Sequence, residues 1–114
     1  MTINIHGTGI DLTNAIKQYV QDKISGLTKF FDNIQQADVD VGMQSHHHQK
    51  GQVYYAEVNL RLPGKIVRCV KEEEDLYKAI DKVKDHLKME LEKIKGKMRE
   101  RDRQGLRSQK EYRG

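Results

Sequence analysis

Hydrophobic residues recur along the chain with two periods, every second residue as in strands and every three to four residues as in helices. These two patterns divide the chain into six predicted elements. Ile3 and Ile5 alternate with polar neighbours, which predicts a short first strand. Residues 14–30 have apolar side chains at helical spacing, with Thr13 in the N-cap position. This segment is therefore predicted to be an amphipathic helix, and Gly26 weakens it near its end.

Three further strands are predicted in the middle of the chain. Period-two alternation runs through residues 37–43 and, most regularly, through residues 54–62, which is typical of strands with one buried face. Pro63-Gly64 predicts a tight turn, because proline presets φ at the first corner and glycine adopts positive φ at the second. Residues 66–70 then form a short strand that pairs with the preceding one.

A long C-terminal helix is the last predicted element. Its apolar residues step by three or four positions and fall in one narrow stripe: Leu76, Ile80, Val83, Leu87, Leu91, Ile94 and Met98. The helix is expected to begin near Asp75, after an acidic run that complements its dipole, and to fray beyond Arg101. Residues 103–114 lack apolar periodicity, so a flexible basic tail is expected there.

The order of these elements is β-α-β-β-β-α, which predicts an α+β fold over residues 1–102. In this arrangement the apolar faces of the two helices cover one face of a four-stranded sheet. A length of 114 residues suits one hydrophobic core and is too short for two.

Positive charge is concentrated toward the C-terminus. The chain has 21 Lys and Arg against 17 Asp and Glu, a net charge of +4, but residues 1–57 hold 4 basic and 6 acidic groups. Residues 93–114 alone hold 9 basic and 3 acidic groups. This asymmetry predicts a polyanionic partner, RNA or DNA before a membrane, and the alternative is a merely solvated helix face.

Several function classes are excluded by the sequence. No apolar run is long enough to cross a membrane, and the N-terminus has no secretory signal. Cys69 is the only cysteine and cannot form an intramolecular disulfide, which favours the cytoplasm, and its place in a strand suggests a small buried residue. No phosphate-binding glycine loop and no nucleophile–base arrangement is present, so we expect neither an enzyme nor a cofactor.

The loop between the second and third strands contains His46-His47-His48. Adjacent histidines do not by themselves provide a tetrahedral set of ligands, and the chain has no Cys-x-x-Cys or His-x-x-x-His motif. No metal site is therefore predicted, and a metal- or protein-interaction function based on this loop stays as one alternative.

Basic residues flank the apolar stripe of the last helix. Lys84, Lys88, Lys95 and Arg99 lie on one flank together with Tyr77, at about 60–120° from the centre of the stripe. Their spacing of one and two helical turns matches the spacing of phosphates along an RNA groove. The same pattern also fits a solvated face with Asp–Lys and Glu–Lys pairs.

Three segments resemble a known family. Residues 74–81 have the sequence Glu-Asp-Leu-Tyr-Lys-Ala-Ile-Asp and lead into a lysine-rich helix, while Asn-Ile-His-Gly at 4–7 and Lys-Phe-Phe-Asp at 29–32 match as well. This pattern is similar to that of the bacterial ribosome hibernation factors, which comprise the short hibernation promoting factor and the ribosome-associated inhibitor. The resemblance covers residues 1–101 in element order and spacing.

The resemblance implies a fold like that of double-stranded RNA-binding domains and a non-enzymatic function. Family members bind the small ribosomal subunit and its rRNA in the channel of mRNA and of the A- and P-site tRNAs, and so block translation in stationary phase or stress. Carried over by position, the RNA-binding residues are Lys23, Lys29, Lys78, Lys82, Lys84, Lys88, Lys95 and Arg99. Arg61, Lys65, Arg68 and Lys71 near the last hairpin are weaker candidates.

Within the family, the short hibernation promoting factor is the closest type. The inhibitor type has an acidic tail, whereas residues 103–114 are basic, and the long type has a second domain for which this chain has no room. The short type favours ribosome dimers together with a ribosome modulation factor. An inhibitor of single ribosomes without dimerisation and a general RNA-binding module are the alternatives.

Overall fold

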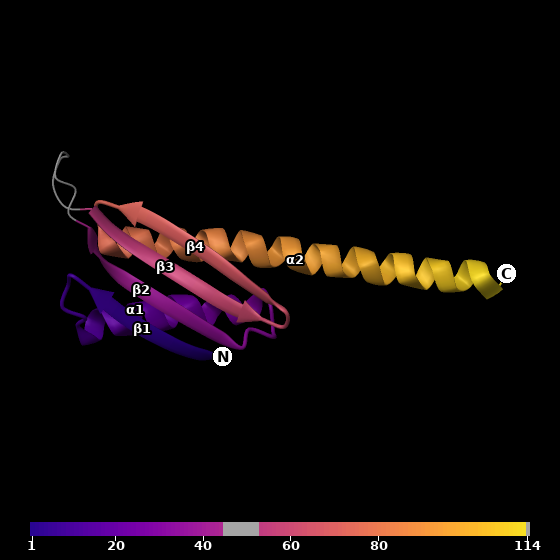
Figure 1. Ribbon diagram of the computed structural model, residues 1–114, viewed down its shortest axis with the longest axis horizontal. Coiled ribbons are helices and arrows are strands. Elements are labelled where there is room, and N and C mark those ends of the chain that lie inside the picture. Colours follow the sequence, from indigo (N-terminus) through magenta and orange to yellow (C-terminus); the bar gives the residue numbers. More distant parts are fainter. Residues whose placement is uncertain (45–52, 114) are drawn as a thin grey trace.

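A computed structural model describes the backbone of residues 1–44 and 53–113 and the side chains of those residues as far as Arg101. The elements follow one another as β1 (Thr2–Thr8), α1 (Asn14–Ser25), the 3₁₀ helix η1 (Gly26–Lys29), β2 (Gln36–Gln44), β3 (Val53–Leu62), β4 (Lys65–Glu73) and α2 (Leu76–Arg113) (Figure 1). The predicted α+β order is confirmed, with each strand slightly longer than the hydrophobic alternation indicated.

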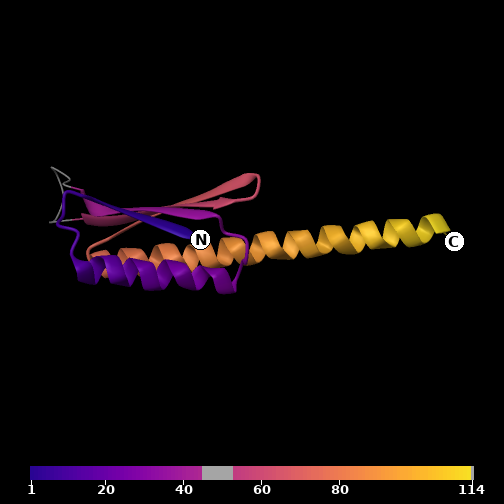
Figure 2. The ribbon, with the colours of Figure 1, turned by 90° about the horizontal axis from the view of Figure 1, so that it is seen from below.

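The four strands form one sheet in the order β1-β2-β3-β4. β1 and β2 are parallel because α1 crosses over between them, whereas β2, β3 and β4 form an antiparallel meander. Both helices lie on the same face of the sheet, side by side and running in the same direction (Figure 2). The other face of the sheet is not covered by any described element (Figures 1 and 2).

Two positions of the sheet favour glycine, one because of its backbone angle and one because a side chain would clash. Gly64 has a φ of 70° in the turn between β3 and β4, as the Pro63-Gly64 pair predicted. A Cβ at Gly42 would lie 2.2 Å from the carbonyl oxygen of Thr8 and 2.9 Å from the ring of Tyr55. Glycine at this position therefore lets the Tyr55 ring lie across β2.

The core lies between the sheet and the two helices. Alternate residues of β2 and β3 point into the core, and each helix contributes one apolar stripe. The fully buried large side chains are Val20, Ile24, Leu27, Val41, Val58, Leu60, Ile80, Val83, Leu87 and Leu91. The predicted stripe of α2 is buried as far as Leu91, half-buried at Ile94 and exposed at Met98. The stripe therefore extends further along α2 than the sheet that covers it.

The first helix is shorter than its hydrophobic pattern predicted. α1 ends at Ser25, with Gly26 as its C-cap, and continues only as the 3₁₀ turn η1 to Lys29. At its start the side chain of Thr13 accepts a hydrogen bond of 3.2 Å from the backbone of Ile16, which confirms the predicted N-cap.

The second helix begins where the sequence indicated and ends later. The Asp75 carboxylate accepts a hydrogen bond of 2.8 Å from the Tyr77 amide and so caps the first turn. Glu72 and Glu73 belong to β4, so the acidic run does not lie at the helix start as a whole. At the other end the backbone stays helical to Arg113, past the fraying expected beyond Arg101, because a helix satisfies its own backbone hydrogen bonds without apolar contacts. That residues 103–114 act as a separate flexible tail stays a prediction.

Replacing the fully buried Leu87 of α2 tests the core directly. The Leu87→Ala variant is expected to lower the free energy of unfolding by about 2–5 kcal/mol, since it leaves a cavity under the centre of the sheet. Urea denaturation followed by circular dichroism measures this loss. Met89→Ala on the exposed side of the same helix is the control and should change stability by less than about 0.5 kcal/mol. Equal effects of the two substitutions would contradict the described packing of α2.

Candidate nucleic-acid interface

The rotation of α2 on the sheet divides its basic residues between two flanks. Lys84, Lys88, Lys95 and Arg99 lie on the flank that faces α1 and η1, and we call these four residues the α1-side flank. Lys88 places its Nζ 4.9 Å from the ring centre of Phe30, which directly follows η1. Lys95 and Arg99 border a hollow together with Phe31.

A polar and aromatic cluster fixes α1 against α2 beside this flank. The Tyr19 hydroxyl donates a hydrogen bond of 2.5 Å to the Asp81 carboxylate, and the ring of Tyr77 meets that of Tyr19 edge-on with centroids 4.8 Å apart. The hydrogen bond to Asp81, followed by partial burial, raises the pKa of Tyr19 to about 12. The phenol therefore stays protonated and acts as the donor at neutral pH.

Cations from the first helix join the same side of the molecule. Lys23 lies 3.5 Å from the Asp81 carboxylate and 5.4 Å from the ring centre of Tyr19, and Lys29 is exposed at the end of η1. Within the described part of the chain, no carboxylate lies within ion-pair distance of the four residues of the α1-side flank. Their charge is therefore available to an external anion.

The remaining two candidates on α2 lie apart from this set. Lys78 pairs with Glu74 at 3.6 Å, and Lys82 pairs with Glu73, whose pKa is lowered by the hydrogen bond from Lys82. These carboxylates belong to β4 and to the segment between β4 and α2. Six of the eight candidate residues thus come from the α1-side flank, α1 and η1, and Lys78 and Lys82 lie elsewhere on α2. A carboxylate lies within ion-pair distance of Lys23, Lys78 and Lys82.

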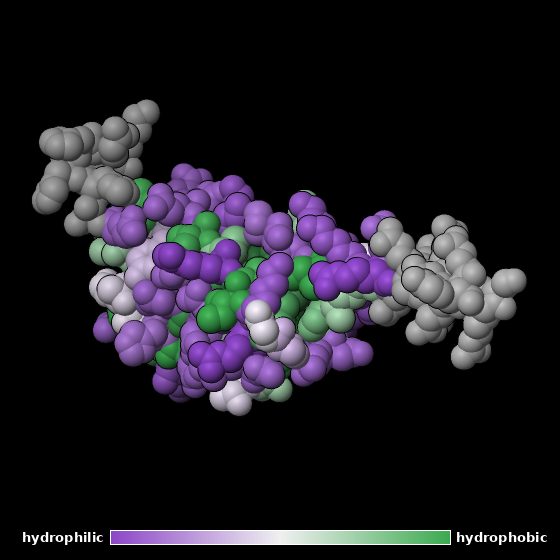
Figure 3. All heavy atoms as spheres, turned by 45° about the vertical axis from the view of Figure 1, so that its right-hand side comes forward, coloured by the Kyte–Doolittle hydropathy of each residue, from purple (hydrophilic) through white to green (hydrophobic). Residues whose placement is uncertain are grey.

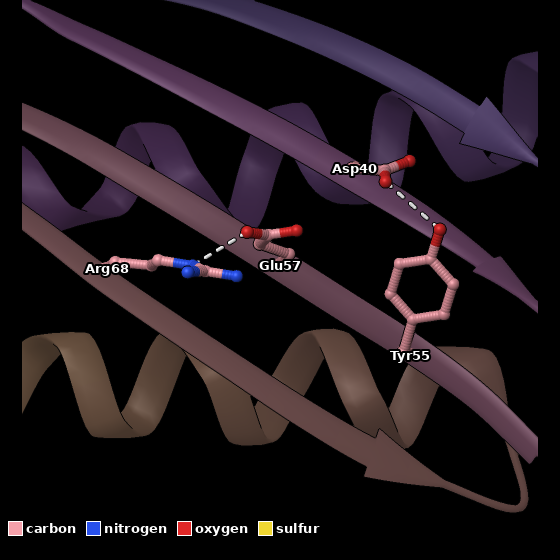
Figure 4. A network of polar contacts seen from close by, with 4 residues as sticks. All are labelled: Asp40, Tyr55, Glu57 and Arg68. Atoms are coloured by element: carbon pink, nitrogen blue, oxygen red, sulfur yellow. Dashed lines mark hydrogen bonds and ion pairs between the residues drawn. The ribbon is translucent and has the colours of Figure 1, made fainter.

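The uncovered face of the sheet holds a group of carboxylates with Arg61 and Arg68 beside them. Asp38, Asp40 and Glu57 occupy neighbouring positions on β2 and β3, in the strand alternation opposite to the core residues. Figure 4 shows Asp40 and Glu57 on the face away from the helices. Arg68 of β4 donates a hydrogen bond of 2.8 Å to Glu57, and the hydrogen bond from Asn4 helps to lower the pKa of Asp38. Arg68, one of the weaker candidates, therefore lies on the acidic side of the molecule.

Tyr55 completes the polar surface of this face. Its ring is almost fully buried across Gly42, and its hydroxyl donates a hydrogen bond of 3.0 Å to Asp40, whose other carboxylate oxygen accepts from Thr8 (Figure 4). Burial raises the pKa of Tyr55, so this donor also remains protonated. The alternation along β3 directs Tyr55 to the face opposite to that of its neighbour Ala56, which lies in the core.

The described residues contain no grouping of three or more His, Cys, Asp or Glu side chains suited to a metal ion. The His46-His47-His48 loop lies outside the described residues. Burial raises the pKa of the Cys69 thiol and so disfavours the thiolate, in agreement with a small core residue. Over the described residues, no helix is long and apolar enough to span a membrane.

Sequence reasoning missed the partners that α1 and η1 contribute to this interface. Neither the Tyr19–Asp81 hydrogen bond nor the position of Phe30 under Lys88 follows from helical spacing, since each joins residues 58 or more positions apart. The available signal was the periodicity itself, which places Tyr77 and Asp81 on the same flank as the lysines.

The Tyr19 phenol provides a test of the helix–helix cluster. The Tyr19→Phe variant should lower the free energy of unfolding by about 1 kcal/mol at neutral pH, because it leaves the Asp81 carboxylate without its hydroxyl donor. Absorbance titration of the wild type should show one phenol with a pKa of about 12, and this phenol should be missing in the variant.

The pH dependence has a defined sign. Because the pKa of Tyr19 is higher in the folded than in the unfolded state, its contribution is complete below pH 10 and is lost as the pH rises toward 12. The stability difference between wild type and Tyr19→Phe should therefore shrink over that interval. A difference that is constant or grows at alkaline pH would contradict the assigned hydrogen bond.

Comparison with known proteins gives relatives along most of the chain. The ribosome hibernation promotion factor of Bacillus subtilis (strain 168) is 32% identical over 104 residues, which are 91% of this chain and 53% of that protein. The ribosome hibernation promoting factor of Azotobacter vinelandii is 36% identical over 107 residues, 94% of each chain. The chain thus spans about half the length of the Bacillus relative and nearly all of the Azotobacter relative.

Solved structures confirm the fold. The Thermus thermophilus Protein Y N-terminal domain, at 32% identity, has a TM-score of 0.71 and is matched over 82% of this chain and 99% of its own. A ribosomal subunit interface protein from Coxiella burnetii has a TM-score of 0.74 at 23% identity, which supports the fold alone.

Residues 3–99 match the family described as Sigma 54 modulation protein / S30EA ribosomal protein. This range is almost the same as residues 1–101, over which the sequence motifs resemble the hibernation factors. The curated relatives named above are ribosome hibernation factors, and the family is not one of enzymes. The chain therefore belongs to the Sigma 54 modulation protein / S30EA ribosomal protein family, as its motifs predicted.

Proposed function

We propose that this protein is a ribosome hibernation factor that binds the rRNA of the small ribosomal subunit through its helical layer. The observation that supports this most directly is a group of cations on the helical layer that no described carboxylate neutralises. The α1-side flank, Lys23 and Lys29 lie on the helical layer, whereas the opposite face of the sheet holds Asp38, Asp40 and Glu57. Arg61 and Arg68 lie beside these carboxylates, whereas the α1-side flank has no described carboxylate partner and so suits a phosphate backbone.

The mechanism is steric occlusion and includes no chemical step. Lysine and arginine contacts to phosphates hold the domain in the channel for mRNA and for the A- and P-site tRNAs, so that those ligands are excluded. The shape of the protein supports such a role, because α2 projects well past the sheet and gives the molecule a longest dimension of 67 Å (Figure 1). The site of action is the cytoplasm, under the conditions of stationary phase or stress.

The contributions of the eight candidates are unequal in this proposal. The α1-side flank and Lys29 contact phosphates directly, with Lys23 shared between Asp81 and the RNA. Lys78 and Lys82 add less, because Glu74 and Glu73 cancel part of their charge, although exposed pairs of this kind are weak and break easily. Residues 103–114 add a basic extension to the same RNA contact.

The protein further favours ribosome dimers together with a ribosome modulation factor. The Azotobacter relative, covered over 94% of its length and named a ribosome hibernation promoting factor, supports this subtype. Inactivation of single ribosomes without dimerisation is the alternative. A sucrose gradient of ribosomes with the protein, with and without the modulation factor, distinguishes them, since only the first function gives a dimer peak.

Charge reversal on the α1-side flank tests the RNA contact. A Lys84→Glu, Lys88→Glu, Lys95→Glu variant should bind small subunits much more weakly in co-sedimentation. Each lost phosphate contact should also reduce the slope of log affinity against log salt by about 0.7–0.9, so the three together should reduce it by about 2–3. The circular dichroism spectrum should stay that of the wild type, because these side chains lie beside the apolar stripe.

The matched control reverses three lysines elsewhere on the helices. A Lys17→Glu, Lys93→Glu, Lys97→Glu variant has the same net charge, but all three side chains are exposed and outside the proposed contact set. It should keep most of the affinity and most of the salt slope. If both variants lose affinity equally, the contact is non-specific; if the wild type binds free duplex RNA as tightly as ribosomes, a general RNA-binding module is the better description.

A further inference from the structure

A small hollow lies where α2 leaves the sheet. It has a volume of about 270 Å³ and is lined by Phe31, Asp32, Asn33, Lys95, Met98 and Arg99. The two walls come from the segment after η1 and from the α1-side flank of α2. The space-filling view toward the exit of α2 shows apolar surface among the polar side chains at this end of the domain (Figure 3).

The apolar lining of this hollow is only partly covered by the described fold. Met98 is the last member of the α2 stripe, and it is 49% exposed, whereas Leu91 two turns earlier is fully buried. Phe31 is half-buried and packs on the edge of the core. The exposed parts of the Phe31 ring and of the Met98 thioether thus offer flat, polarizable surface to a ligand.

Charged and polar groups surround this apolar surface. Lys95 and Arg99 lack a carboxylate partner among the described side chains, and Lys88, about two turns before Lys95, lies over Phe30. Asp32 and Asn33 add an acceptor carboxylate and an amide on the opposite wall. An aromatic wall with cations on one side and hydrogen-bonding groups on the other matches a nucleotide, which joins a flat base to an anionic phosphate.

We propose that this hollow binds one unstacked nucleobase of the RNA, so that the protein recognises an extruded nucleotide as well as duplex phosphates. The inference rests on the function proposed above and specifies the part of the RNA that it contacts. The base lies against the Phe31 ring and the Met98 thioether, and Lys95 and Arg99 contact the phosphates on either side of it.

Asp32 orients the nucleotide in this arrangement. Its carboxylate repels phosphate, which keeps the backbone on the Lys95 and Arg99 side, and it accepts hydrogen bonds from a base that presents amino or imino hydrogens. The volume of the hollow suits a single base, since pockets for whole drug-sized ligands begin near 300 Å³.

The test uses two RNA hairpins of the same stem, one fully paired and one with a single bulged 2-aminopurine. The wild type should bind the bulged hairpin roughly five- to a hundredfold more tightly, the range that one base–aromatic stack provides, and should quench the fluorescence of the bulged base. The Phe31→Leu variant keeps an apolar side chain but removes the aromatic face, so it should lose the preference and the quenching.

A second pair of variants keeps the test independent of folding. Met98→Glu introduces a carboxylate into the hollow at a half-exposed position and should bring binding of the bulged hairpin down to that of the paired one. Met89→Glu, at a position that is 55% exposed on another side of α2, makes the same change outside the hollow and should leave the preference intact.

The outcomes separate this inference from the proposed function. If the wild type co-sediments with small subunits but binds both hairpins equally without quenching, the base site is wrong and the ribosome contact stands. If Met89→Glu abolishes the preference as fully as Met98→Glu, the effect is one of charge and the site is again refuted. If the wild type binds neither ribosomes nor either hairpin, the proposed function fails together with the site.

Discussion

Burial of the α2 stripe against the sheet is the contact on which the rest of the molecule depends. Ile80, Val83 and Leu87 lie fully under β3 and β4, and their position fixes the rotation of the helix about its own axis. A rotation by one residue would turn the stripe by about 100° and expose it. The same burial therefore decides which lysines face α1 and which face β4.

The charge segregation follows from this rotation together with the sheet topology. Because successive residues of a strand point to opposite faces, the apolar positions of β2 and β3 direct their acidic neighbours to the uncovered side. The helices cover the other side and present their lysines outward. The carboxylates Asp38, Asp40 and Glu57 thus gather on the uncovered face beside Arg61 and Arg68, whereas the α1 side of α2 holds cations that have no described carboxylate partner.

Contacts between α1 and α2 complete the basic surface. The Tyr19–Asp81 hydrogen bond and the Lys88–Phe30 contact hold residues from two elements in fixed relative positions. The Asp81 carboxylate lies 3.5 Å from the Lys23 ammonium group and so neutralises part of its positive charge. The hollow near Phe31 forms where these contacts end, because α2 continues past the sheet while the chain after η1 turns back into β2.

The sequence by itself determined the element order, the sheet-covering stripe and the family, because periodicity and short motifs are local properties of the chain. It also placed Tyr77, Lys84 and Lys88 on one flank of α2. Helical spacing also put Lys78 and Lys82 further round the helix than the α1-side flank. Only the tertiary structure showed that Lys82 pairs with Glu73 of β4. The contact of Phe30 with Lys88 and the position of Phe31 in the hollow likewise depend on how α1 and η1 pack beside α2. The periodicity of a single helix carries no information about which residues of another segment lie next to it.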